Sequence, residues 1–138
     1  MTSNSPACIH RVLEGNIQEF VLTETSRRAV DELFDTVENI MKDAYARNDM
    51  SIIAGRFLLD CRVGILPLNH AFARALSMTK NYPSHPQSRT ACLFASGPLV
   101  KPIYYFLRRV VSVHIYGIDE RDAALAWLSE PVEAKSGR

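Results

Sequence analysis

The sequence predicts an α/β fold, a single domain with a five-stranded mixed sheet and helices packed against it. Strand-like segments alternate with segments whose apolar residues recur at three- and four-residue steps, as they do in amphipathic helices. The run from Ile52 to Leu59 is almost continuously apolar, which is typical of a strand covered on both faces. Gly15-Asn16 separates two short strand-like segments and indicates a tight hairpin. The expected order is therefore ββαβαβαβα, with mostly parallel pairing.

The amino-terminal third is expected to form the hairpin and one long helix. Residues 10–14 and 17–23 are the two strands. The helix is expected over residues 26–47, with Thr23 or Thr25 as its cap. Its apolar residues form one stripe that faces the sheet: Val30, Leu33, Phe34, Val37, Ile40, Met41 and Tyr45.

The middle of the chain is expected to form the central strand and a second helix. The polar segment 48–51 leads into the apolar run, which is a strand as far as Leu59. Pro67 suits the first turn of the next helix, and Tyr82-Pro83 ends that helix. The inward stripe comprises Leu68, Phe72, Ala75, Leu76 and Thr79.

The carboxyl-terminal third is expected to contain two more strands, at residues 89–95 and 111–116, after a surface loop at residues 82–88. The stripe of the helix between them is Leu99, Ile103, Phe106, Leu107 and Val110. Pro98 and Pro102 leave the start of this helix open, because only one proline can occupy the first helical position. Asp119 is expected to cap a last helix that ends at Pro131, with Ala124, Trp127 and Leu128 facing inward.

Length and composition indicate one globular domain over residues 10–130, between flexible tails at 1–9 and 131–138. The 138 residues are 47% hydrophobic and 22% charged, and the net charge of +1 provides no field that would attract nucleic acid or an acidic membrane. The first residues lack the basic region and apolar stretch of a signal peptide, and no segment approaches the length of a membrane span, so we expect neither feature. The three cysteines are widely spaced, as expected for reduced thiols. These features predict a cytoplasmic protein.

Four short patterns carry a resemblance to a known family. They are Arg11-Val12-Leu13-Glu14-Gly15, the segment TSRRAVDE at 25–32, Leu58-Leu59-Asp60-Cys61-Arg62 and the segment AALAWL at 123–128. Together with the order of elements, they resemble the SpoIIAA-like proteins of the STAS superfamily over roughly residues 10–130. The resemblance implies a module that binds a protein partner. In the anti-sigma factor antagonists of that superfamily, a Ser at the start of the helix after the central strand is phosphorylated as a switch.

The sequence departs from that family at the switch itself. Neither Ser nor Thr occurs between Asp60 and Ser77. No phosphorylation site is therefore expected at this helix start. The resemblance then implies a non-enzymatic binding or regulatory module that lacks the phosphorylatable Ser.

Cys61 and His70 are the nearest approach to a catalytic nucleophile and base, with Asp60 as a group that orients the base. Asp60 and Cys61 are neighbours on a strand and should point to opposite faces of the sheet, and no oxyanion-hole motif accompanies them. The histidines lack close ligand spacing. We therefore expect no enzymatic activity, no cofactor and no metal site.

Two helix starts at the carboxyl edge of the sheet form a candidate ligand site. Five residues surround them: Arg62, Asn69, Ser96, Gly97 and Lys101. Free backbone N–H groups at helix starts, reinforced by two cations, favour an anionic group. This predicts a carrier or sensor of a small anionic or partly apolar ligand. The alternative is that Arg62 pairs with Asp60 or Asp119 and that residues 96–98 form only a turn and a cap.

The consecutive apolar segment Ile65-Leu66-Pro67-Leu68 is a candidate surface for a protein partner or for self-association. The alternative is that a neighbouring loop buries it.

Two other groups of residues have structural interpretations. Aromatic and basic residues interleave over 104–109, and we interpret them as core residues and helix-end cations instead of a nucleic-acid surface. The carboxylates Asp31, Glu32, Asp35 and Glu38 are interpreted as the solvated face of the first helix.

Overall fold

The computed structural model describes residues 5–95, 100–108 and 112–131 and confirms the α/β fold. The strands are β1 (Cys8–Leu13), β2 (Ile17–Leu22), β3 (Arg56–Cys61), β4 (Arg89–Phe94) and β5 (Val113–Gly117). Over the described residues they form one sheet in the order β1-β2-β3-β4-β5. The β1–β2 pair is antiparallel and the other three pairs are parallel, as the order of elements predicts.

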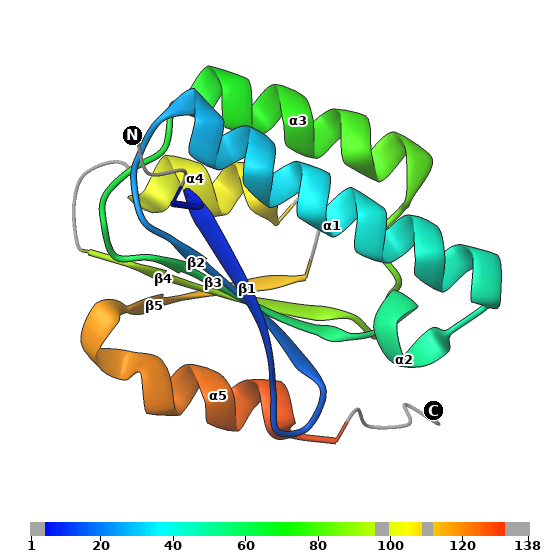
Figure 1. Ribbon diagram of the computed structural model, residues 1–138. Helices are drawn as coiled ribbons and strands as arrows, with labels where there is room; N and C mark the ends of the chain where they lie inside the picture. Colours follow the sequence, from blue (N-terminus) through cyan, green and yellow to red (C-terminus); the bar gives the residue numbers. More distant parts are fainter. Residues whose placement is uncertain (1–4, 96–99, 109–111, 132–138) are drawn as a thin grey trace.

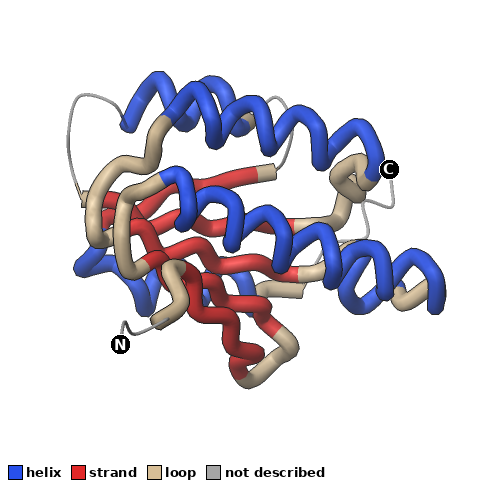
Figure 2. Tube along the Cα trace, turned by 45° about the horizontal axis from the view of Figure 1, so that its top comes forward, coloured by secondary structure: helices blue, strands red, loops and turns tan. Residues whose placement is uncertain are grey.

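Helices cover both faces of the sheet (Figure 1). They are α1 (Arg27–Arg47), the short α2 (Met50–Ile53), α3 (Leu68–Asn81), α4 (Val100–Leu107) and α5 (Arg121–Ser129). Helices α1, α3 and α4 lie on one face and α5 on the other. Figures 1 and 2 both show α1 and α3 side by side over the same strands. None of the described helices has the length and apolar character needed to cross a bilayer.

The sheet separates two apolar cores. The core under α1 and α3 includes Phe20, Leu22, Val30, Leu33, Cys61 and Cys92. The core under α5 includes Ile17, Leu58, Ala91, Leu93, Ala124 and Leu128. Because successive side chains of β3 and β4 point to opposite cores, these strands have few polar positions.

The hairpin differs in detail from the expected two-residue turn. Leu13 pairs with Ile17, so the connection has three residues, and the Asn16 N–H donates to the Leu13 carbonyl at 3.0 Å. Gly15 and Asn16 both have positive φ, 84° and 62°, a conformation that these two residue types adopt most readily.

Two expected helix caps are wrong. Ser26, not Thr23 or Thr25, caps α1, and its Oγ accepts from the Ala29 N–H at 3.2 Å. Asp119 lies in a 3₁₀ turn (Ile118–Glu120) that precedes α5, and Glu120 stands at the cap position of α5. The Glu120 carboxylate instead accepts from the Gly117 N–H at 2.7 Å, so this polar stretch closes a turn before the helix begins.

The central strand also begins later than expected. Residues 50–53 form α2, and β3 starts only at Arg56. Asp49 caps α2, with Oδ1 accepting from the Ser51 N–H at 3.1 Å. A Cβ at Gly55 would lie 2.8 Å from the Ser51 carbonyl oxygen, so the tight exit from α2 requires glycine. The apolar residues Ile52 and Ile53 thus belong to a helical turn.

At the start of the domain, residues expected in a flexible tail are held in place. β1 begins at Cys8, and Ala7 is fully buried. The Ala7 and Cys8 N–H groups donate to the Glu32 carboxylate of α1 at 2.7 and 3.1 Å. Residues 1–4 and 132–138 of the expected tails lie outside the described residues, as does Pro98; the described part of α4 begins at Val100, so Pro102 lies in its first turn.

Candidate functional site

A cavity of about 150 Å³ lies between the α1–α3 helix pair and the sheet. Its floor consists of Phe20 on β2, Phe57 and Leu59 on β3, and Thr90 and Cys92 on β4. The α1 wall consists of Leu33, Phe34, Val37 and Met41. Phe57 and Thr90 are each the second residue of a parallel strand. The other three floor residues are each the fourth residue of a six-residue strand, so the cavity lies over the amino-terminal and central parts of the parallel strands.

Small and flexible side chains on α3 leave this space open. Ala75, Met78 and Thr79 form the α3 wall, and Ala75 is a buried residue of the inward stripe. A methyl group at this position reaches less far toward α1 than a larger apolar side chain would. Ile53 of α2 completes the apolar lining.

The loop between α3 and β4 closes one end of the cavity. Tyr82, Pro83, Ser84, His85 and Ser88 of this loop line it. Pro83 and Ser84 are also exposed, so the cavity reaches the surface here. We call residues 82–88 the mouth loop.

Several contacts hold the mouth loop against the body of the domain. The Tyr45 hydroxyl on α1 donates to the Pro83 carbonyl at 3.5 Å, and the Tyr45 and Tyr82 rings lie 5.3 Å apart. The Ser88 Oγ donates to the Gly55 carbonyl at 3.1 Å, and Arg56 donates to the Gln87 carbonyl at 3.0 Å. The mouth loop thus has defined positions for its polar groups.

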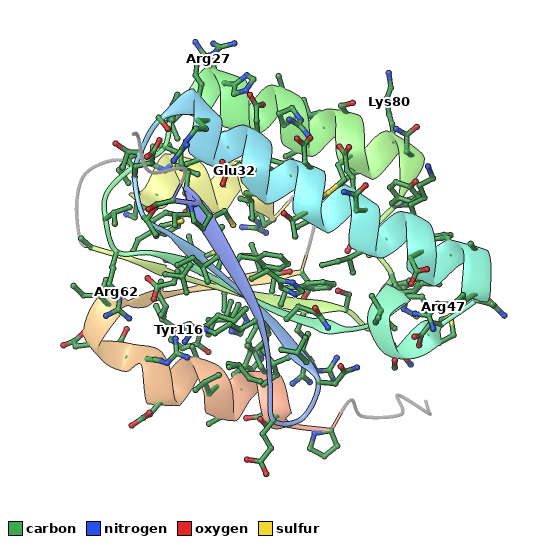
Figure 3. The ribbon with its side chains drawn as sticks, in the orientation of Figure 1. Arg27, Glu32, Arg47, Arg62, Lys80 and Tyr116 are labelled. Atoms are coloured by element: carbon green, nitrogen blue, oxygen red, sulfur yellow. The ribbon has the colours of Figure 1, made fainter. Side chains whose placement is uncertain are left out.

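The candidate ligand site predicted from the sequence lies at the opposite end of β3. Arg62 follows the last residue of β3, whereas the mouth loop follows the end of α3. Figure 3 shows Arg62 and Lys80, near the end of α3, at opposite ends of the molecule. The observed cavity and the predicted edge site are therefore separate places.

The side chain of Arg62 pairs with a neighbouring carboxylate. Its Nε lies 3.0 Å from both oxygens of Asp60, and its Nη2 lies 2.9 Å from Oδ2. This hydrogen bonding raises the pKa of Arg62. Asn69 and Lys101 are exposed, and Ser96 and Gly97 lie outside the described residues. Of the two partners considered for Arg62, the structure shows Asp60. The two residues lie two positions apart at the end of a strand, so their side chains can meet.

A second charged group at this edge was not anticipated from the sequence. Glu19 of β2 is fully buried, and two arginines neutralise it: Arg121 Nη1 lies 2.6 Å from Oε2, and Arg11 Nη2 lies 2.9 Å from Oε1. The only signal in the sequence is a Glu at a position that alternation assigns to a buried face. These two ion pairs connect β2 with β1 and with α5, so the charge of Glu19 has a structural role.

The proposed nucleophile and base do not meet. Cys61 is fully buried in the α1–α3 core, and burial, with nearby Cys92 and Asp60, raises its pKa well above the ordinary range. His70 Nε2 instead lies 2.7 Å from Oδ1 of Asp31 on α1. Burial also raises the pKa of Cys92 to about 12. The described part of the chain thus offers neither an accessible thiolate nor a Cys–His pair.

The apolar segment at residues 65–68 is not an exposed patch. Leu66 is only 9% exposed, and Ile65 and Leu68 pack against the α1–α3 core. Val63 is the exposed apolar side chain of this loop, at 43%. The loop folds back over the end of the core, so the predicted partner surface at Leu66 is corrected to buried packing.

The carboxylates of α1 are more engaged than a solvated face would be. Arg74 on α3 donates to Asp31 at 2.7 Å and to Asp35 at 2.8 Å, and its Nη2 lies 3.6 Å from Glu38. These contacts join the two helices that roof the cavity. No group of three or more His, Cys, Asp or Glu residues in the described ranges is arranged to hold a metal ion.

Comparisons with protein-family models, with curated proteins and with solved structures find no match to this chain.

Proposed function

We propose that this protein is a non-enzymatic binding protein that carries or senses a small apolar ligand in the cavity under α1 and α3. The observation that carries the proposal is the combination of size and lining. The cavity of about 150 Å³ is walled mainly by aliphatic, aromatic and thioether side chains. An engineered cavity of about 150 Å³ with a similar lining in another protein binds benzene or xenon.

The size of the cavity also limits the affinity. Very small ligands gain at most about 1.5 kcal/mol per non-hydrogen atom. A ligand of six to eight such atoms therefore reaches at best a Kd of about 0.3 µM to about 2 nM. We expect weaker binding in practice, because this bound applies only to the best very small ligands.

In this proposal the protein is a cytoplasmic regulatory module of STAS-like type, a role that the order of strands and helices supports. The ligand would then take the place of phosphorylation as the signal, since residues 61–76 contain neither Ser nor Thr. A binding site between two helices and the sheet favours such a role, because a ligand there contacts α1, α3 and the mouth loop together.

Titration with toluene tests the proposal. Wild-type protein should show a rise in Tm and NMR shift changes confined to the cavity lining, since a ligand that binds only the folded state stabilises it. Ala75→Leu, which fills the cavity from α3, should abolish both effects. Ala73→Leu is the matched control, because Ala73 is exposed on the same helix. Equal responses of the two variants, or no response of the wild type, would contradict the proposal.

A further inference from the structure

We infer that the ligand of this cavity is uncharged and carries one hydrogen-bond acceptor, which the Nε2–H group of His85 recognises. The inference rests on the proposed function and names the chemical class of the ligand. The charges, hydroxyl groups and histidine of the cavity lining support it.

The lining first excludes charged ligands. None of the residues that the structure places around the cavity is Asp, Glu, Lys or Arg. An ion buried there would lose its hydration without meeting an opposite charge, which is costly in an apolar site. A carboxylate or an ammonium group is therefore selected against.

Two of the lining hydroxyls already donate to the backbone. Thr79 Oγ1 donates to the Leu76 carbonyl at 3.1 Å, and Ser88 Oγ donates to the Gly55 carbonyl at 3.1 Å. Each hydroxyl has only one hydrogen to give. These two groups therefore have no donor left for a ligand.

His85 differs because its backbone contact fixes its tautomer. The Gln87 N–H donates to Nδ1 of His85 at 3.0 Å. A backbone N–H cannot accept, so Nδ1 carries no proton, and the neutral ring must carry its proton on Nε2. The ring thus offers one group to a ligand, and that group is a donor.

The remaining lining hydroxyls do not change this preference. Tyr82, Ser84 and Thr90 can each donate or accept. Ser84 is also exposed to water. His85 differs from these hydroxyls because its contact with the Gln87 N–H fixes its role as a donor, so it favours an acceptor on the ligand over a methylene at the same position. A small ketone, ether or ester with an apolar body fits these requirements.

A pair of ligands of the same shape tests the inference. Cyclohexanone and methylenecyclohexane have the same number of non-hydrogen atoms, but only the ketone has an acceptor. His85→Phe keeps a ring in the mouth loop and removes the donor. This variant should raise the ratio of the cyclohexanone Kd to the methylenecyclohexane Kd about fivefold to tenfold, as expected for loss of one hydrogen bond.

The control variant is His114→Phe, because His114 is exposed on β5 and stacks on Trp127 of α5, on the other side of the sheet. It should leave both Kd values unchanged. NMR of the ring nitrogens provides a second measurement that does not depend on any variant: His85 should show a protonated Nε2 and an unprotonated Nδ1.

The outcomes separate the two proposals. Suppose that methylenecyclohexane binds the wild type, that Ala75→Leu abolishes this binding, and that His85→Phe does not change the ratio of the two Kd values. The inference is then overturned and the proposed function stands. A protonated Nδ1 in the neutral ring would overturn it as well. If neither ligand binds the wild-type protein, both the proposed function and the inference fail.

Discussion

Glu19 is a fully buried charge whose two partners come from other elements of the fold. Its carboxylate is fully buried in β2, directly across from Arg11 of β1, and Arg121 approaches it from α5. A buried carboxylate is tolerated only when charged groups compensate for its lost hydration. Both arginines reach solvent at one end, whereas the glutamate does not. The arginines therefore keep part of their hydration, whereas Glu19 depends on them to compensate its charge.

Arg121→Ala should lower the free energy of unfolding by about 3 kcal/mol, because it leaves a buried carboxylate with a single, largely exposed partner. Urea denaturation followed by circular dichroism measures the loss. Arg47→Ala is the control, since it breaks only pairs with Asp43 and Asp49 on the surface, which contribute little. A loss for Arg121→Ala no larger than that for Arg47→Ala would show that the Glu19 site is not a stabilising contact.

At the scale of elements, the α1–α3 pair combines an apolar underside with a charged upper seam. Arg74 and His70 of α3 both contact Asp31 of α1. The hydrogen bond from His70, and then the one from Arg74, lower the pKa of Asp31. The seam connects the two helices above the cavity, so its charge state bears on the roof of the cavity.

Because the pKa of Asp31 is lower in the folded protein, its ionised form stabilises the fold. This contribution is complete above the ordinary Asp pKa of about 3.9 and is lost as pH falls through the lowered value. The difference in urea midpoint between the wild type and Asp31→Asn should therefore be largest near neutral pH and disappear in acid.

Asp43→Asn provides the comparison for this experiment. Asp43 pairs with Arg47 within α1, so its variant accounts for the general effect of removing a carboxylate from α1. A midpoint difference for Asp31→Asn that stays constant from pH 7 to pH 2 would contradict the lowered pKa.

The sequence predicted the elements well where one pattern dominated. The long apolar stripe specified α1, and the nearly continuous apolar run located the region of β3. The prediction was wrong where the same residues are compatible with both a strand and a helix. Ile52 and Ile53 continue the apolar run, yet the Asp49 cap and the close packing at Gly55 place them in α2. Only the local geometry distinguishes these alternatives.

For the whole molecule, the observed cavity lies away from the edge at which the sequence predicts a ligand site. The general rule for parallel sheets directs attention to the carboxyl edge, but there Arg62 pairs with Asp60 and Leu66 is buried. The cavity lies toward the other end, where Phe20, Ala75 and His85 come together from distant parts of the chain. Its volume depends on how those side chains meet, which residue spacing alone does not give. The one indication of the cavity in the sequence was the small residue Ala75 on the inward stripe of α3.

The two cores also predict how stability is distributed over the sheet. β3 and β4 each have two neighbouring strands and apolar cores on both sides, whereas β1 is an edge strand with exposed Arg11 and Val12. Amide hydrogen exchange resolved by NMR should therefore be slowest at Leu58 and Leu93, where it requires global unfolding. Exchange should be much faster toward the end of β1.

Glu32 should make the start of β1 an exception. Its carboxylate accepts from the Ala7 and Cys8 N–H groups, and Figure 3 shows Glu32 on α1 close to the beginning of the strand. We expect these two amides to exchange more slowly than those near Val12, and Glu32→Ala to remove that difference without affecting Leu58. Fast exchange at Leu58 in the wild type would instead mean that the sheet opens from its centre, which the two-sided packing of β3 does not allow.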